Sequence, residues 1–173
     1  MSTKPHYEAD KEIEESKDGW SLKPNALSIV WGNDNRYWIM PQPGREEGAK
    51  LLQVSWLEVT GTSKKSLTKG NKYGISFVIE LTDGSFGWNG CPVFLMAKLG
   101  KKGQYKWQKV SLSDLPKNQK HEIPIGNQFT LEVPFDCTND DLVLYFGLYE
   151  VWTGRWKGGL SIYEAKIKDL SSI

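Results

Sequence analysis

Residues 73–81, with the sequence YGISFVIEL, carry a large apolar side chain at every second position. Smaller or charged residues, among them Gly74, Ser76 and Glu80, lie between them, and the turn-forming sequence TDGS follows. Successive side chains of a β-strand point to opposite sides of the sheet, so this alternation places the apolar set on one face. The segment therefore predicts a β-strand with one face in a hydrophobic core.

Strand patterns continue toward the C-terminus. Residues 91–99 (CPVFLMAKL) are apolar on both faces and end at GKKG, which predicts a hairpin turn into a partner strand over residues 104–111. Residues 142–152 (LVLYFGLYEVW) are almost continuously apolar, which is typical of a central strand. The turn TGR then predicts a reversal of the chain into a final strand over residues 160–167.

Strand patterns also precede residue 73. Residues 27–31 (LSIVW) predict a strand that ends at the polar turn GNDN, and residues 37–40 (YWIM) predict the next one. Apolar residues then alternate from Leu52 to Trp56 before the phase shifts by one position at Leu57. Such a shift inside one strand indicates a β-bulge or burial on both faces. Because Trp56 continues the first phase, we expect it in the core.

Eight or nine short strands, with no amphipathic helix and no alternation of strands and helices, predict an all-β protein. The expected architecture is an antiparallel, jelly-roll-like β-sandwich formed by residues 20–173. Residues 1–19 contain three lysines and six acidic residues, a net charge of −3, and only one sizeable aliphatic side chain. They predict a polar, solvated N-terminal tail, with at most a helical turn or two at KEIEESK.

Composition excludes several classes of protein. The 173 residues include 22 Lys and Arg against 21 Asp and Glu, so the net charge of +1 gives no strong field toward nucleic acid or membranes. No apolar run is long enough for a membrane span, and the polar first twenty residues predict no secretory signal. The two cysteines, Cys91 and Cys137, are expected as buried or free thiols rather than a structural disulfide.

Catalytic and metal-binding motifs are absent from the sequence. There is no P-loop, no GxSxG, no HExxH and no Cys/His spacing that suits a metal, so we predict no catalytic residue, metal or cofactor. His6 lies in the predicted tail, and His121 is expected in an exposed loop. Glycoside hydrolysis needs only two carboxylates, and a pair such as Glu58 and Glu150 keeps a glycosidase open as a minor alternative.

Tryptophan is the unusual feature of the composition: eight Trp accompany only two His. Trp20 is expected to anchor the N-terminal tail to the domain, and Trp107 is expected to lie on a half-exposed sheet face. The other indoles outside the core occur at strand ends or in loops, beside polar residues. These candidate surface positions are Trp31, Asn33, Asp34, Trp38, Trp88, Asn89, Glu150, Trp152, Trp156 and Lys157.

Exposed indoles beside short polar side chains suit carbohydrate recognition. The C–H face of a pyranose packs on the π-face of an indole, and its hydroxyls hydrogen-bond to Asn, Asp and Glu. Single-stranded RNA also stacks on aromatic rings, but it requires a positively charged groove. The visible basic stretch is KKGQYKWQK, residues 101–109, whereas Asp34 and Asp83 lie near the candidate indoles. Sugar binding is therefore favoured, with RNA binding as the alternative.

Four ordered blocks of the sequence resemble the plant phloem protein 2 family, which includes tobacco agglutinin. They are LSIVWGNDNRYW at 27–38, LLQVSWLEV at 51–59, YGISFV at 73–78, and LYEV at 148–151 followed by WKGGL at 156–160. The resemblance to cucurbit phloem lectins is the most pronounced.

The resemblance implies a jelly-roll-like sandwich that binds oligomers of N-acetylglucosamine, including chitooligosaccharides and N-glycan cores. It also implies no catalysis, no metal, no membrane insertion, synthesis without a signal peptide, a cytoplasmic, phloem-sap or nuclear location, and a homodimer. Phloem relatives are expected to cross-link through cysteines or to associate with RNA in some cases, and the sequence leaves both properties open.

The resemblance also assigns residues to the sugar site. Trp31 and Trp38 match the two tryptophans of the family's opening signature, which also contains Arg36 and Tyr37. Glu150 matches the acidic residue of its LEV block, and Trp156 with Lys157 matches its WK pair. The complete predicted carbohydrate site is Trp31, Asn33, Asp34, Arg36, Tyr37, Trp38, Trp88, Asn89, Glu150, Trp152, Trp156 and Lys157.

Overall fold

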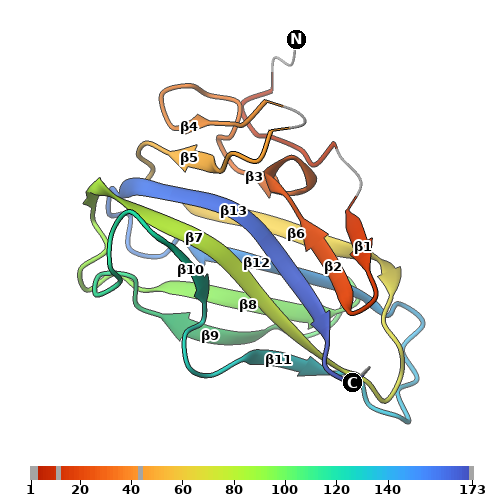
Figure 1. Ribbon diagram of the computed structural model, residues 1–173. Coiled ribbons are helices and arrows are strands. Elements are labelled where there is room, and N and C mark those ends of the chain that lie inside the picture. Colours follow the sequence, from red (N-terminus) through yellow and green to blue (C-terminus); the bar gives the residue numbers. More distant parts are fainter. Residues whose placement is uncertain (1–3, 11–12, 43–44, 172–173) are drawn as a thin grey trace.

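The computed structural model describes residues 4–10, 13–42 and 45–171. Two antiparallel sheets pack face to face, and β13 and β7 cross in front of β6, β12 and β8 in the view of Figure 1. The predicted all-β sandwich is therefore confirmed. Over the described residues it contains thirteen strands rather than eight or nine, because several pairings involve only two to four residues.

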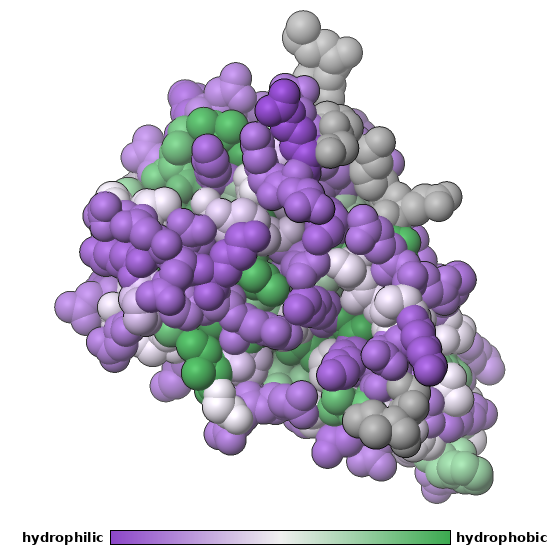
Figure 2. All heavy atoms as spheres, in the orientation of Figure 1, coloured by the Kyte–Doolittle hydropathy of each residue, from purple (hydrophilic) through white to green (hydrophobic). Residues whose placement is uncertain are grey.

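The first sheet has β13 and β7 at its centre. These two strands pair along most of their length; β2 and β5 extend the sheet beyond β13, and β10 and β11 extend it beyond β7. Its members are β1 (Glu14–Ser16), β2 (Gly19–Leu22), β4 (Trp38–Ile39), β5 (Ala49–Leu51), β7 (Lys72–Phe86), β10 (Lys120–Ile123), β11 (Phe129–Glu132) and β13 (Gly158–Asp169). Its outer face, turned toward the viewer in Figure 2, is mainly hydrophilic.

The second sheet has five strands in the order β3-β6-β12-β8-β9. They are β3 (Ser28–Ile29), β6 (Leu57–Ser66), β12 (Val143–Glu150), β8 (Val93–Leu99) and β9 (Lys106–Val110). The predicted hairpin from β8 to β9 and the central position of β12 are both confirmed. A single 3₁₀ turn, Pro24–Ala26, is the one helical element among the described residues, and no helix there is long and apolar enough to span a membrane.

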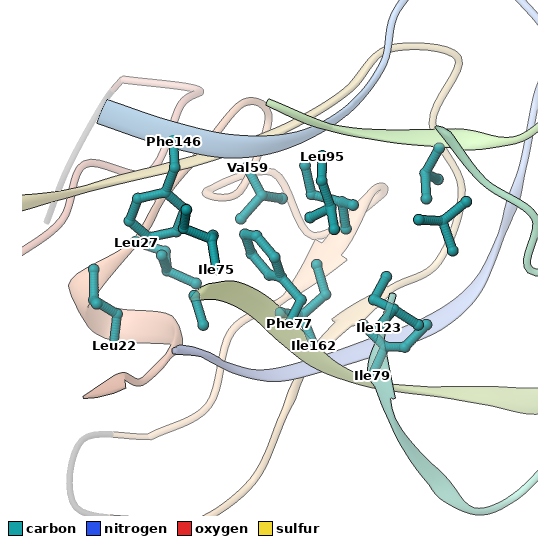
Figure 3. Close-up of a cluster of buried hydrophobic side chains, with 14 of the residues drawn as sticks. Leu22, Leu27, Val59, Ile75, Phe77, Ile79, Leu95, Ile123, Phe146 and Ile162 are labelled. Atoms are coloured by element: carbon teal, nitrogen blue, oxygen red, sulfur yellow. The ribbon is translucent and has the colours of Figure 1, made fainter. Parts of the chain in front are cut away.

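The hydrophobic core lies between the two sheets. All five alternating apolar residues of β7, from Tyr73 to Leu81, are buried, as the sequence predicts. The rings of Phe77 on β7 and Phe146 on β12 meet with centroids 5.9 Å apart, and Figure 3 shows both among aliphatic side chains from each sheet. Period-two alternation therefore fixes the inner face of each long strand, and this rigid sandwich positions the loops at its ends.

The segment around Trp56 differs from the prediction. Strand β5 ends at Leu51 and β6 begins at Leu57, so the phase shift marks a crossing between the two sheets rather than a bulge within one strand. Between them only Val54 pairs, in an isolated bridge to Lys157. Trp56 is consequently 45% exposed, and its Nε1 donates to the carboxylate of Glu58. The prediction of a core position for Trp56 is wrong.

The N-terminal residues that the structure describes are mostly exposed, as predicted for a polar tail, but parts of them pair with the sandwich. Tyr7 exchanges backbone hydrogen bonds with Ile29, and Glu14–Ser16 forms β1 against β2. The helical turn expected at KEIEESK is therefore replaced by a strand over residues 14–16, while residues 11–12 lie outside the described part. Tertiary pairing overrides the local helical preference here, because the edge of β2 offers hydrogen-bond partners to an extended segment.

Other individual predictions have mixed outcomes. Trp20, on β2, packs beside Tyr73 with ring centroids 6.2 Å apart, and Trp107 is exposed on β9 as predicted. His121 lies in β10 rather than in a loop. Cys91 is buried and Cys137 half-buried, both as free thiols.

Candidate functional site

A row of aromatic rings lies at the end of the sandwich where the predicted site residues meet. The Trp31 and Tyr37 centroids are 5.7 Å apart, and those of Tyr37 and Trp156 are 6.3 Å apart. We call Trp31, Tyr37 and Trp156 the aromatic row. Trp31 and Tyr37 are half-buried and Trp156 is 51% exposed, so the row forms part of the surface. It joins the turn after β3 to the loop before β13.

The turn that carries Trp31 has an unusual backbone. Trp31 adopts φ 67°, a left-handed conformation that is costly for a bulky residue. Its backbone N–H donates to Nδ1 of His6 at 2.9 Å, and the His6 ring meets the indole edge-on at 4.9 Å. The Trp31 carbonyl accepts from the N–H of Asp34. Contacts from the N-terminal segment thus hold an indole orientation that the local sequence does not favour.

Asp34 and Arg36 form a compact ion pair beside the row. The Asp34 carboxylate accepts from the Arg36 backbone N–H and Nε at 3.0 Å each, and from Nη2 at 2.7 Å. These hydrogen bonds from Arg36 lower the pKa of the Asp34 carboxyl. The guanidinium carbon in turn lies 5.2 Å from the Tyr37 ring centroid. Asp34 therefore orients Arg36 against Tyr37, which gives the row a charged hydrogen-bond donor at its edge.

Asn33 has a role beyond the predicted one. Its Nδ2 donates to the carbonyls of Lys4 and His6 at 3.0 and 2.9 Å. Both amide hydrogens are used within the protein, so the predicted contact of Asn33 with sugar would be made by its Oδ1 and stays a prediction. Asn33 also fastens the N-terminal segment to the Trp31 turn.

Glu150 and Lys157 are brought together, but inside the protein. Lys157 Nζ lies 2.8 Å from Glu150 Oε1, and the two residues are 0% and 1% exposed. The same ammonium donates to the carbonyls of Ser55 and Arg155 at 3.0 and 2.9 Å. Thr153 Oγ1 donates to the carboxylate at 2.6 Å. The predicted direct contact of this pair with sugar is therefore corrected, since neither side chain reaches the surface.

The ionisation of Glu150 depends on these partners. Burial raises the pKa of the carboxyl, but hydrogen bonds from Lys157, Thr153 and Cys91 outweigh it and hold the pKa below its ordinary value. The carboxylate also accepts the backbone N–H of Trp152. The ion pair thus closes the loop of residues 151–157 and fixes the backbone that carries Trp156.

Trp38 and Trp88 are also buried, which corrects the prediction that their indoles face a ligand. Trp88 Nε1 donates to the carbonyl of Gly158 at 3.0 Å. Gly87 has φ 85°, which lets the chain turn before Trp88. The backbone of Gly87 also lies close to the loop that carries Trp156, since a Cβ at Gly87 would lie 2.3 Å from the Trp156 carbonyl oxygen. Trp38 pairs with Leu51 beneath the Trp31 turn. Both indoles belong to the hydrophobic core rather than to the surface.

The two remaining predicted residues lie at the margin. Asn89 is exposed, and its backbone carbonyl accepts from the Arg155 guanidinium, which joins the Trp88 loop to the 151–157 loop. Trp152 points elsewhere: its ring meets Phe94 of β8 at 4.9 Å and belongs to the outer face of the five-stranded sheet. Trp152 is therefore not part of the aromatic row.

Sequence reasoning missed one residue at the row and one exposed indole elsewhere. His6 packs on Trp31 although 25 positions separate them, and no local pattern signals that contact. Trp56 is exposed because it lies between two strands. The one sequence signal for this position is the shift of the apolar pattern by one residue at Leu57.

Comparisons with known proteins bear on the identity of this fold. Residues 17–168 match the sequence model of the family described as Phloem protein 2. Protein PHLOEM PROTEIN 2-LIKE A9 of Arabidopsis thaliana is 40% identical over 175 residues, which cover 95% of this chain and 96% of the relative. A protein of Coccinia grandis named Lectin is 28% identical over 111 residues, 61% of this chain and 69% of that one.

Among solved structures, the CBM22-1–GH10 modules of a Clostridium thermocellum endo-1,4-beta-D-xylanase, complexed with xylohexaose, have a similar fold. The sequences are 11% identical, the TM-score is 0.50, and the match covers 94% of this chain and 30% of that one. At this identity the likeness supports the β-sandwich fold alone. The match over most of the sequence and the 40% identical relative together show that the chain belongs to the phloem protein 2 family.

Proposed function

We propose that the protein is a non-catalytic lectin that binds oligomers of N-acetylglucosamine, such as chitooligosaccharides and N-glycan cores, at the aromatic row. The observation that carries the proposal is the contact between Trp31, Tyr37 and the exposed indole of Trp156, which come from two distant segments. Membership of the phloem protein 2 family and the similarity to a protein named Lectin support it.

The proposed binding mode follows from the chemistry of the row. Rings that lie side by side offer stacking positions for the C–H faces of consecutive sugars. Arg36 supplies charged N–H donors from its position over the Tyr37 ring, suited to sugar hydroxyls and to the acetamido oxygen. Each sugar hydrogen bond adds only about 0.5–1.5 kcal/mol, because water competes for the same groups. We therefore expect oligomers to bind more tightly than the single sugar.

In this proposal the buried residues act by positioning. The ion pair of Glu150 with Lys157 fixes the backbone on each side of the loop that presents Trp156. Catalysis is not part of the proposal, because Glu150 is buried in that ion pair and is held away from any surface ligand. We also infer a phloem-sap or cytoplasmic location, with the nucleus as a further site, and a homodimer.

Calorimetric titration with the N-acetylglucosamine trimer tests the proposal. We expect measurable binding that Trp156→Ala weakens by about tenfold, the equivalent of one lost stacking contact. Trp107→Ala is the matched control, since Trp107 is 59% exposed but lies on the far strand β9. No heat and no competition at millimolar trimer would refute the assignment, and binding of RNA that falls steeply with salt would favour the nucleic-acid alternative.

A further inference from the structure

The outer face of the five-stranded sheet carries a second surface of aromatic and polar side chains. A groove of about 370 Å³ runs along it, lined by residues of β3, β6, β12 and the β8–β9 hairpin together with Ala9 and Ala26. Strand register arranges this face in rows, because residues paired across antiparallel strands point to the same side. The rows cross β6, β12, β8 and β9 in turn.

The middle row has no side chain at its centre. It consists of Thr60, Gly147, Met96 and Trp107. A Cβ at Gly147 would lie 2.7 Å from the Tyr149 ring and from the Val59 carbonyl. Glycine at this point therefore leaves room for the Tyr149 ring, which lies close to the Gly147 backbone.

Two tyrosines of β12, Tyr145 and Tyr149, line the groove. Tyr145 and Tyr149 flank Gly147 at two residues on either side, so all three positions face outward. Burial, followed by the nearby phenol of Tyr105 and the carboxylate of Glu58, raises the pKa of Tyr149. The phenol thus stays protonated and able to donate near neutral pH. The groove therefore combines ring faces, phenol hydroxyls and the hydroxyls of threonines on β6.

Charges are unevenly distributed along the groove. Lys98 pairs with Tyr145 at one end, and its ammonium lies 4.7 Å from the Tyr105 centroid and 5.9 Å from that of Tyr145. Lys101 lines the same end, and its carbonyl accepts from Lys98 Nζ at 2.7 Å. Glu58 lies at the opposite end, paired with Tyr149. The lining of one end thus carries two ammonium groups, and the Asp141 carboxylate accepts the Lys101 backbone N–H beside it. The other end carries the Glu58 carboxylate, and tyrosines occupy the space between the two ends.

We propose that this groove is a second ligand site, which binds an oligosaccharide bearing a carboxylate. The carboxylate binds at the Lys98 and Lys101 end, and the neighbouring sugar rings pack against Tyr145 and Tyr149. Charge complementarity selects the acidic group, and the threonine and tyrosine hydroxyls suit the sugar hydroxyls. This site is on a different surface from the aromatic row and does not depend on the function proposed there.

The distribution of charge argues against a nucleic acid as the ligand of this groove. A single strand carries a phosphate at every nucleotide and requires cations along the whole path. Here a strand that extends from Lys98 toward Glu58 would bring phosphates to a carboxylate. An oligosaccharide with one acidic residue at the cationic end meets no such repulsion.

Titration of the intact protein with a tetrasaccharide that carries a single glucuronic acid residue at one end tests the site, with the N-acetylglucosamine tetramer and an oligouridylate as comparison ligands. We expect the uronate to bind, with affinity reduced about tenfold by Lys98→Gln, the loss of one charge-assisted hydrogen bond. Lys98→Arg should retain binding. Lys65→Gln, also on an exposed part of β6 in this sheet, is the matched control and should leave it unchanged.

The position of the site is tested by two further variants. Tyr145→Ala should weaken uronate binding severalfold, whereas Trp156→Ala should not change it. The proposal would be overturned if the uronate did not bind, or if its affinity were unchanged in Lys98→Gln and Tyr145→Ala. It would also be overturned if the oligouridylate bound more tightly than the uronate. Loss of uronate binding in Trp156→Ala would place the uronate at the aromatic row instead and would also overturn it. Melting temperatures of all variants identify any that do not fold.

Discussion

Replacing Lys157 with methionine removes the cation that accompanies a buried carboxylate. In the structure Lys157 Nζ lies 2.8 Å from Glu150 Oε1 and also donates to two backbone carbonyls. The methionine side chain fills a similar volume but provides no donor. The Lys157→Met variant therefore leaves Glu150 in the interior with only the hydrogen bonds from residues 91 and 152–153.

The size of the effect follows from the geometry. Two unit charges 2.8 Å apart attract by about 6 kcal/mol at an effective dielectric constant of about 20, and much of this gain offsets the desolvation of the two ions. Removing one partner of a buried pair typically costs about 3–5 kcal/mol, since the other charge stays desolvated. For a chain of this length, we expect the melting temperature to fall by about 6–20 °C.

The loss of unfolding free energy is measured by urea denaturation of four proteins: the wild type, Lys157→Met, Glu150→Gln and the double variant. The double variant should be more stable than Lys157→Met, because it no longer contains an unpaired buried charge. Lys65→Met is the control: it removes an exposed ion pair with Glu15 and should cost less than about 1 kcal/mol. A Lys157→Met variant as stable as Lys65→Met would refute the reasoning.

Three further predictions concern stability. Gly87→Ala should destabilise the protein by more than Gly154→Ala, because both glycines have positive φ but only Gly87 lies against the Trp156 backbone; urea midpoints of the two variants give the comparison. Trp56→Ala should cost clearly less than the about 3–5 kcal/mol typical of a core tryptophan, since the indole is 45% exposed, and a larger loss in denaturation would contradict its position outside the core. Burial raises the pKa of Glu164, but hydrogen bonds from Ser21 and Lys23 outweigh it and hold the pKa below the ordinary value of 4.5. Its stabilising contribution is therefore complete above pH 4.5 and is lost as the pH falls through the lower folded-state value. The stability difference between wild type and Glu164→Gln should shrink in that acidic range, and a constant difference from pH 7 to pH 3 would contradict it.

Local sequence predicted the long strands well because each carries its own burial pattern. The alternation in β7 was sufficient to place its inner face, and the nearly continuous apolar run of β12 was sufficient to predict a central strand. The same pattern misplaces Trp56, since the alternation across residues 52–56 predicts one strand where the chain crosses between the two sheets. Apolar spacing shows which residues share a face only while the backbone stays extended within one sheet.

The candidate site was predicted in location but not in detail. Most of the chosen residues do meet at one end of the sandwich, yet Glu150, Lys157, Trp38 and Trp88 are buried there instead of exposed. Their residue types indicated polar and aromatic chemistry without showing which side chains face water. Trp88 shows why burial could not be predicted locally: its indole N–H donates a hydrogen bond to the carbonyl of Gly158, a residue 70 positions away.

The sequence by itself determined the all-β class, the position of the long strands and the end of the molecule where the aromatic residues gather. Only the tertiary structure decided that Trp31, Tyr37 and Trp156 form the exposed row, and that Trp152 belongs to a different face. The physical reason is that strand formation depends on a period of two along the chain, whereas exposure depends on neighbours contributed by distant segments.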